Sequence, residues 1–235
     1  MPTTTVTFDA ILFDMDGTLV DSTAGVTAAW EAIVREYPGE GLSVEEILSS
    51  THGIRTVENL RRVCGIVDPD ELEREAERFE MAIIEGAALG GGIVKLPGVE
   101  AIINDLAPGS TLPNPKWAIC TSAKRKYATS ALSAAGIKIP DIFVVAEDVK
   151  QGKPAPDPYI LGAGKCGVKP ERCLVVEDSP SGIKSGNTAG CKTLGLLTTH
   201  SPRQVVESSP DYTVKDLSSV SMKIVNGVVE VTISG

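Results

Sequence analysis

The sequence lacks any apolar run long enough to cross a membrane, and Met1 to Asp9 carry no basic segment followed by an apolar stretch. The first absence excludes a membrane-spanning protein. The second leaves neither a secretory signal nor an Arg-rich transit peptide, so we expect a cytoplasmic location and no membrane partner. The composition, 42% hydrophobic and 23% charged, is that of an ordinary globular chain with ample length, at 235 residues, to bury a core.

Cysteine is sparse and positive charge is in deficit. The five cysteines are an odd set with no CxxC spacing, which argues against a disulfide framework or a zinc site, so we expect buried free thiols. A formal net charge of −9 opposes binding to nucleic acid or to anionic lipid. It does not exclude a small phosphorylated metabolite, because a cation and helix N-termini inside a pocket bind such a ligand locally.

Four short apolar runs each end in a polar or acidic cluster: Ala10–Phe13, Trp117–Cys120, Ile142–Val145 and Cys173–Val176. Continuous apolar character is typical of strands buried on both faces, as in a parallel sheet covered by helices. Three helical stretches supply the crossovers, at Lys124–Ala135, Pro156–Cys166 and Pro180–Ala189. The pattern predicts an α/β fold.

The segment from Asp21 to Lys95 has helical patterns and no comparable apolar run; the patterns cover Val26–Tyr37, Val44–Ser49, Val57–Val63 and Glu71–Glu85. A helical insertion is the simplest account, and it ends near the turn-forming Leu96-Pro97-Gly98. We therefore expect a core of residues 1–20 and 96–235 with an inserted helical domain of residues 21–95. Near the carboxyl end, Asn226-Gly227 predicts a β-hairpin within Lys223–Ile233.

The residues that follow the apolar runs are those that carry chemistry. In an open parallel sheet the ligand lies outside the carboxyl ends of the strands, so side chains just after the runs converge there. These side chains are Asp14, Asp16, Thr121, Ser122, Lys153, Glu177 and Asp178.

Asp14 and Asp16 lie two residues apart, and Gly17 permits a tight turn behind them. Such carboxylates are costly unless a cation compensates them; magnesium prefers oxygen ligands and also holds a phosphate oxygen. One carboxylate then attacks phosphorus and the other handles the proton of the leaving group. An isolated Asp-x-Asp pair often only stabilises a turn. Glu177-Asp178, at the end of another run, favours the cation, which needs carboxylates from more than one strand.

Lys153 and Thr121-Ser122 have both ordinary and functional interpretations. Lys153, in a proline-rich turn, is either solvated or a fixed charge that orients the nucleophile and neutralises phosphoryl oxygens. Thr121-Ser122 either caps the next helix or binds phosphate, and the two roles are compatible because both use the same donors.

These residues resemble the four motifs of the haloacid dehalogenase superfamily of phosphotransferases. The motifs occur in order, each after a strand-like run: Asp14-x-Asp16-Gly17-Thr18, Thr121-Ser122, Lys153 and Glu177-Asp178. The resemblance implies a Rossmann-like parallel sheet with helices on both faces and a helical cap inserted after the first motif. Aspartate at position 16 is typical of the phosphatases and phosphomutases of the superfamily, rather than of its ion pumps or dehalogenases.

The resemblance also implies roles for the residues. Asp14 would be the nucleophile that forms an aspartyl-phosphate, and Asp16 the general acid and base. Mg²⁺ would be held by Asp14, by the Asp16 carbonyl and by Asp178, with Glu177 a less certain ligand. The remaining motif residues, Thr121, Ser122 and Lys153, would hold the phosphoryl group.

A closer resemblance, to fungal 2-deoxyglucose-6-phosphate and glycerol-phosphate phosphatases, covers nearly the whole chain. It is carried by Thr51-His52-Gly53-Ile54-Arg55 with Glu58, by Trp117-Ala118-Ile119 and by Gly182-Ile183-Lys184-Ser185-Gly186. It implies a phosphatase for a small sugar or polyol phosphate. His52 and Arg55 would be surface residues on an ordinary helical insertion; in this family their segment points into the active site, so we expect both to bind substrate.

Three alternatives stay open at this point. Phosphoglycolate phosphatases and β-phosphoglucomutases have the same type of cap, and His52 is a candidate for the proton handling that a mutase requires. A regulatory protein that kept the fold without turnover is a third alternative. For the assembly we expect a monomer or a weak dimer.

Overall fold

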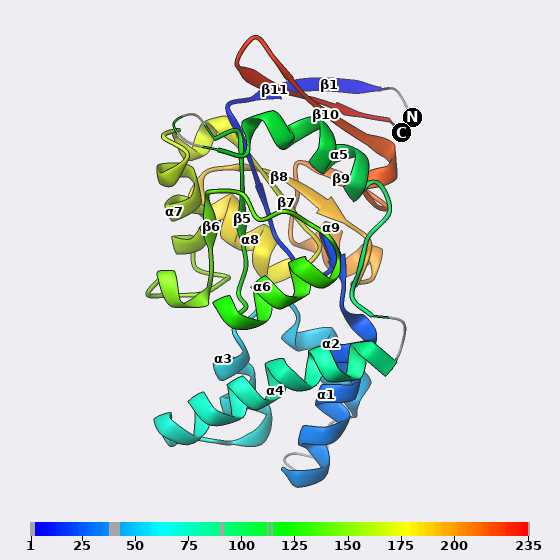
Figure 1. The fold of residues 1–235 in the computed structure, drawn as a ribbon, viewed down its shortest axis with the longest axis vertical. Coiled ribbons are helices and arrows are strands. Elements are labelled where there is room, and N and C mark those ends of the chain that lie inside the picture. The colour runs from blue at the N-terminus through cyan, green and yellow to red at the C-terminus, as the bar shows by residue number, and fades with distance from the viewer. Residues whose placement is uncertain (1–2, 38–42, 90–91, 112, 114, 235) are drawn as a thin grey trace.

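The computed structural model describes residues 3–37, 43–89, 92–111, 113 and 115–234. Figure 1 shows an α/β core in the upper part of the view and a layer of helices beneath it. The two parts meet where the parallel strands of the core end.

The core sheet has six parallel strands in the order β6-β5-β2-β7-β8-β9. Their bounds are β2 Ala10–Phe13, β5 Trp117–Cys120, β6 Phe143–Val144, β7 Cys173–Glu177, β8 Lys192–Leu196 and β9 Tyr212–Val214. The four apolar runs are confirmed as strands, and β2 lies at the centre, where Leu12 is level with Ala118 of β5 and Val175 of β7. The most central strand therefore delivers Asp14.

Helices cover both faces of this sheet, as the α/β prediction required. They are α5 Val99–Leu106, α6 Arg125–Ala134, α7 Asp157–Lys165, α8 Pro180–Ala189 and α9 Pro202–Glu207, with short 3₁₀ turns at Ala107–Gly109, Ala146–Asp148, Pro170–Arg172 and Leu217–Ser219. Alternate residues of β2 enter different apolar clusters: Ile11 and Phe13 pack on the side of α5 and α6, and Leu12 packs with Tyr159 of α7. This alternation fixes which face each residue of the strand presents.

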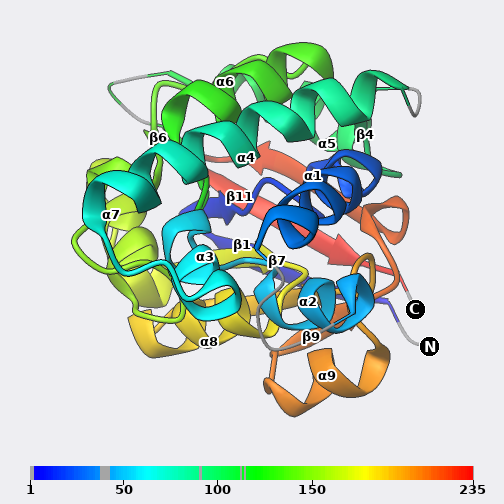
Figure 2. The same cartoon turned by 90° about the horizontal axis from the view of Figure 1, so that it is seen from below.

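The inserted helical cap consists of α1 Thr23–Glu36, α2 Val44–Thr51, α3 Thr56–Cys64 and α4 Pro69–Leu89, seen from below in Figure 2. The longest pair, α1 and α4, packs closely: the rings of Trp30 and Phe79 are 4.7 Å apart. Short strands β3 (Val20–Asp21) and β4 (Val94–Lys95) pair antiparallel where the chain leaves and re-enters the core. The domain boundaries at 20/21 and 95/96 stay a prediction.

A three-stranded antiparallel sheet of β1 (Thr4–Phe8), β11 (Val228–Ile233) and β10 (Val220–Val225) lies at the end of the core away from the cap (Figure 1). The predicted hairpin is confirmed, and Asn226 and Gly227 both have positive φ, at 50° and 80°, as a tight hairpin turn requires. The pairing of β1 with β11 joins residues more than 200 positions apart. That distant partner explains why the short threonine-rich β1 was not predicted.

The cysteines are all free, as expected: Cys120, Cys166, Cys173 and Cys191 are buried, whereas Cys64 on α3 is only half-buried. Within the described ranges, no helix combines the length and apolar character needed to span a membrane.

Candidate active site

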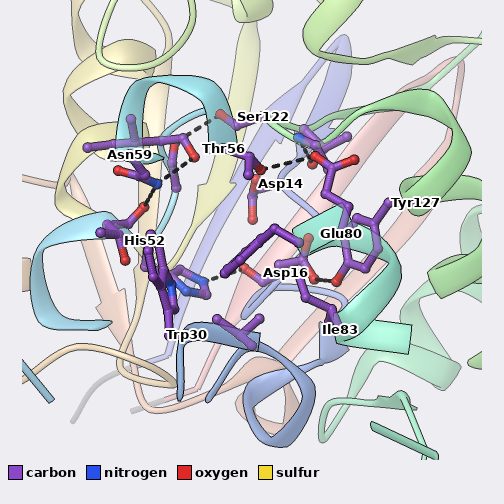
Figure 3. A pocket seen from close by; sticks show the side chains of 17 residues that line it. Asp14, Asp16, Trp30, His52, Thr56, Asn59, Glu80, Ile83, Ser122 and Tyr127 are labelled. Carbon is purple, nitrogen blue, oxygen red and sulfur yellow. Dashed lines mark hydrogen bonds between the residues drawn. The ribbon is translucent and has the colours of Figure 1, made fainter. Parts of the chain in front are cut away.

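The residues that follow the strands lie together at the edge of the sheet that faces the cap. Asp14 and Asp16 follow β2, Thr121 and Ser122 follow β5, and Asp178 follows β7. A cavity of about 80 Å³ lies between this edge and the cap, and Figure 3 shows Asp14, Asp16 and Ser122 of the core around the same space as His52 and other cap residues. The convergence predicted from the strand ends is present.

Lys153 connects two carboxylates beneath this cavity. Its Nζ donates hydrogen bonds to Asp14 Oδ1 (2.5 Å) and to Glu177 Oε1 (2.7 Å), and all three side chains are buried. Although burial opposes the charged form, the carboxylates of Asp14 and Glu177 raise the pKa of Lys153. The lysine is therefore a permanent cation beside the expected nucleophile.

Glu177 is saturated by groups of the protein itself. Its Oε1 also accepts from Tyr159 Oη (2.8 Å), and its Oε2 accepts from the backbone N–H of Asp178 and of Ser179 and from Ser179 Oγ, each at 3.0 Å. A Cβ on Gly182 would lie 1.6 Å from Oε1, so only glycine fits there. These contacts make Glu177 an anchor for Lys153, and its place among the metal ligands stays a prediction.

Two hydrogen bonds orient the carboxyl group of Asp16. Ser22 Oγ (2.6 Å) and Tyr127 Oη (2.7 Å) both donate to its Oδ1, so the carboxyl group is fixed in one orientation. Burial raises the pKa of Asp16, although these two hydrogen bonds oppose the shift. A carboxyl group with a raised pKa is suited to donate a proton to a departing oxygen.

Three buried carboxylates, Asp14, Glu177 and Asp178, lie close enough for one ligand oxygen of each to fall within 4.8 Å of the others. Burial raises the pKa of Asp14 strongly, against the opposing charge of Lys153. Lys153 and a protonated His52 supply two positive charges beside three carboxylates, and oxygen donors of this kind are the ligands that Mg²⁺ prefers. The residues present therefore fit a magnesium ion.

His52 of the cap reaches the same group. Its Nε2 donates to the Asp16 carbonyl (2.9 Å) and lies 3.2 Å from Asp178 Oδ2. Although burial opposes its charge, Asp178 raises the pKa of His52 to about 10. His52 thus lines the cavity, as predicted, and touches two of the oxygens assigned to the metal.

The two hydroxyl residues expected to bind phosphate also lie next to the cap. Thr121 and Ser122 line the cavity, and Ser122 Oγ donates to the carbonyl of Gly53 (2.9 Å). Gly53 has φ +76°, and a Cβ there would lie 2.1 Å from Ser179 Oγ, so glycine allows the cap to approach the core this closely.

Arg55 is an expected site residue that does not line the cavity. Three further expected site residues do not line it either, but they lie next to Asp14: Lys153, Glu177 and Asp178. The Arg55 guanidinium donates to the carbonyls of Ala146 (3.0 Å), Val149 (2.6 Å) and Lys150 (3.2 Å), in the core loop that precedes Lys153. The side chain joins cap to core through its two Nη groups, which donate to backbone carbonyls, whereas its buried Nε has no partner among the described residues.

The residues at or beside the cavity that were not predicted from the sequence include Ser22, Asn59, Glu80 and Tyr127. Two of them had a usable signal. Glu80 interrupts the apolar stripe of α4 between Ala76 and Ile83, and Asn59 lies beside Leu60 on the buried face of α3. Polar residues on an apolar stripe are expected to have a reason for burial.

Residues 8–190 match the model of the haloacid dehalogenase-like hydrolases. The chain belongs to this family. The match spans the four motifs and the cap, and the family explains why the charged groups collect at the strand ends.

The family relatives include phosphatases. The chain is 40% identical over 185 residues to hexitol phosphatase A of Escherichia coli, covering 79% of this chain and 81% of that one. It is 33% identical over 232 residues to glycerol-1-phosphate phosphohydrolase 1 of Saccharomyces cerevisiae, covering 94% and 88%. A hydrolase of Pseudomonas syringae, 25% identical, superposes with a TM-score of 0.77 over 89% of this chain and 94% of that one. The protein is an enzyme of the phosphatase type, and the predicted resemblance to the fungal phosphatases is confirmed.

Proposed function

We propose that this enzyme is a magnesium-dependent phosphatase that hydrolyses a small sugar or polyol phosphate through an aspartyl-phosphate on Asp14. The observation that carries the proposal is that Asp14 and Asp16 line one small cavity between core and cap, while Lys153 donates a hydrogen bond to Asp14 from behind it. At about 80 Å³ the cavity is far smaller than the roughly 300–1,000 Å³ of pockets for drug-sized ligands, which favours a small leaving group. The names of the hexitol and glycerol-phosphate relatives support the substrate class.

In the first step a carboxylate oxygen of Asp14 attacks phosphorus, and the bond from phosphorus to the substrate oxygen breaks. Asp16 gives its proton to that oxygen, so the product leaves as a neutral alcohol. Lys153 keeps the attacking carboxylate in place and offsets negative charge on the phosphoryl oxygens. Thr121, whose Oγ1 accepts from the Ala123 N–H, would donate a hydrogen bond from its hydroxyl group to one of these oxygens. Ser122 would do the same on exchanging its hydrogen bond to the Gly53 carbonyl.

In the second step Asp16, now a carboxylate, takes a proton from water. The water oxygen attacks phosphorus, and the bond between phosphorus and Asp14 breaks to give orthophosphate and the free carboxylate. Ser22 and Tyr127 hold Asp16 in one orientation through both proton transfers. The docked cap limits the access of bulk water to the reacting atoms.

Asp14, the Asp16 carbonyl and Asp178 would hold the magnesium ion; Glu177, engaged with Lys153, would support the site from behind. The bound cation supplies positive charge beside the transferring phosphoryl group. We also propose that the enzyme is cytoplasmic and that it is a monomer or a weak dimer. Both proposals rest on the sequence.

Phosphate release from a panel of phosphorylated metabolites tests the proposal, with magnesium and then with excess chelator. The panel includes glycerol 1-phosphate, a hexitol 6-phosphate, 2-deoxyglucose 6-phosphate, phosphoglycolate and p-nitrophenyl phosphate. We expect magnesium-dependent release, fastest from the sugar or polyol phosphates. Full activity in chelator, or release from none of these compounds, would contradict the proposal.

A further inference from the structure

The cap side of the cavity contains a buried carboxylate that the phosphoryl chemistry does not use. Glu80, on α4, is 4% exposed and lines the cavity. Thr56 Oγ1 (3.0 Å) and the backbone N–H of Lys124 (3.3 Å) both donate to its Oε1. Among the described residues no hydrogen bond reaches its Oε2. The side chain is thus anchored through one oxygen and has the other available to a ligand.

Asn59, on α3, presents a second unused acceptor. Its Nδ2 donates to the carbonyls of Thr51 (2.8 Å) and Ile54 (3.3 Å), which fixes the orientation of the amide because a flip would lose both bonds. Its Oδ1 is buried and has no hydrogen-bond partner in the described part of the chain. A buried acceptor without a donor is unfavourable, so a hydroxyl group supplied by a ligand would satisfy it.

The wall beside these acceptors is apolar and carries no fixed cation. Trp30, Phe79 and Ile83 line it, and no lysine or arginine is among the described residues that line the cavity. His52 is directed at the Asp16 carbonyl and at Asp178. Arg55 is occupied by the carbonyls of the core loop. A leaving group with a second negative charge would therefore meet Glu80 with no lysine or arginine, among the described lining residues, to offset the repulsion.

We propose that Glu80 and Asn59 select the leaving group, accepting hydrogen bonds from the hydroxyls of a neutral polyol and disfavouring leaving groups that carry a carboxylate or a second phosphate. This inference rests on the proposed function and sharpens it. It separates polyol monophosphates from phosphoglycolate and from the sugar bisphosphates that a phosphomutase handles.

Glu80→Gln is the variant of choice, because the amide oxygen keeps the bonds from Thr56 and Lys124. The amide N–H₂ then takes the place of Oε2, so the cavity exchanges a charged acceptor for a neutral donor. Glu77→Gln, one turn earlier on α4 with an exposed side chain bound to Lys126, is the matched control.

Specificity constants for a hexitol 6-phosphate and for phosphoglycolate are measured at pH 8, above the raised pKa of Glu80, so that its carboxylate is charged. We expect Glu80→Gln to reduce the ratio of the two, polyol over phosphoglycolate, by about 10–100-fold, as expected for a lost charge-assisted hydrogen bond and a removed repulsion. Glu77→Gln leaves the ratio unchanged. A folding defect lowers both constants together and does not move the ratio. An unchanged ratio in Glu80→Gln overturns the inference.

The affinities of both compounds are also measured by calorimetry with magnesium, in Asp14→Asn and in Asp14→Asn with Glu80→Gln, where no turnover is needed. One outcome is that Asp14→Asn binds the polyol phosphate selectively, that Glu80→Gln abolishes this selectivity, and that the wild type nevertheless releases no phosphate. This outcome refutes the proposed function and keeps the inference. Phosphate release with binding selectivity that does not depend on Glu80 refutes the inference and keeps the proposed function.

Discussion

The core and cap sides of the cavity satisfy their polar groups differently. On the core side, the two oxygens of Glu177 accept five hydrogen bonds, all from the protein itself. On the cap side, Glu80 Oε2 and Asn59 Oδ1 have no donor among the described residues. Acceptors whose hydrogen bonds all come from the protein are held in place before substrate binds. Acceptors without a protein donor can accept a hydrogen bond from a ligand. Under the proposed function, this difference corresponds to chemistry in the core and selectivity in the cap.

The largest effect is expected from the core. Asp14→Asn keeps the shape of the side chain and removes the nucleophile, so phosphate release should fall by at least about 10⁴-fold. Steady-state phosphate release measures the loss, and thermal melting followed by circular dichroism checks that the fold is kept. Residual activity within about tenfold of the wild type would place the nucleophile at another residue. It would contradict the assignment of the chemistry to Asp14 of the core.

Asp178→Asn tests the metal. Its carboxylate is buried and accepts a hydrogen bond from Thr18 Oγ1 (3.2 Å). Replacing the carboxylate by an amide removes the negative charge of one proposed magnesium ligand. We expect the magnesium concentration for half-maximal activity to rise by more than about 100-fold, since losing groups that merely orient ligands costs 10–100-fold. Magnesium titrations of activity measure it, with the exposed Asp105→Asn as control. An unchanged titration would remove Asp178 from the ligand set.

Glu80 also predicts a pH-dependent stability. Burial raises its pKa from 4.5 to about 7, against the hydrogen bonds from Lys124 and Thr56. A raised carboxyl pKa means that the fold favours the neutral form, so this contribution is complete below pH 4.5 and is lost as the pH rises through about 7.

The glutamine side chain of Glu80→Gln cannot ionise. The free energy of unfolding of this variant, relative to that of the wild type, should therefore be about 2–3 kcal/mol higher at pH 8 than at pH 5. Urea unfolding at the two pH values measures the difference, and Glu77→Gln should show none. A Glu80→Gln variant that gains nothing between the two pH values would show that the fold tolerates the charge.

The smallest effect is expected from Arg55, which holds the cap to the loop of Ala146, Val149 and Lys150. Arg55→Ala should raise KM by about tenfold, for p-nitrophenyl phosphate as much as for a polyol phosphate, because the contact promotes cap docking without touching the leaving group. The exposed Arg61→Ala is the control. A loss confined to the polyol phosphate would return Arg55 to the substrate site, as the sequence predicted.

Local patterns sufficed for the core. The apolar runs at Ala10–Phe13 and Trp117–Cys120 match β2 and β5, and Pro180–Ala189 matches α8 residue for residue. Because parallel strands bring their carboxyl ends to one edge, the position of Asp14 and Asp16 followed from the fold class. The family motifs then supplied the roles.

The contacts of the cap could not be read in the same way, because they depend on how two domains dock. Arg55 meets a loop about 90 residues away, and Tyr127 reaches Asp16 from a helix that follows a different strand. Neither pairing has a local pattern. Glu80 is visible in the sequence as a charged residue on the apolar stripe of α4. The cavity that it lines is formed only when cap and core pack together, so the sequence did not reveal it.

Trapping of the intermediate tests the central claim most directly. Asp16→Asn lacks the base that activates water, so p-nitrophenyl phosphate, whose leaving group needs little protonation, should phosphorylate the enzyme faster than water releases it. Rapid quenching followed by peptide mass spectrometry should locate the phosphoryl group on Asp14, together with a burst of p-nitrophenol. The double variant Asp14→Asn with Asp16→Asn should show neither. A phosphoryl group on another residue, or steady release of phosphate with no phosphorylated enzyme, would contradict the account.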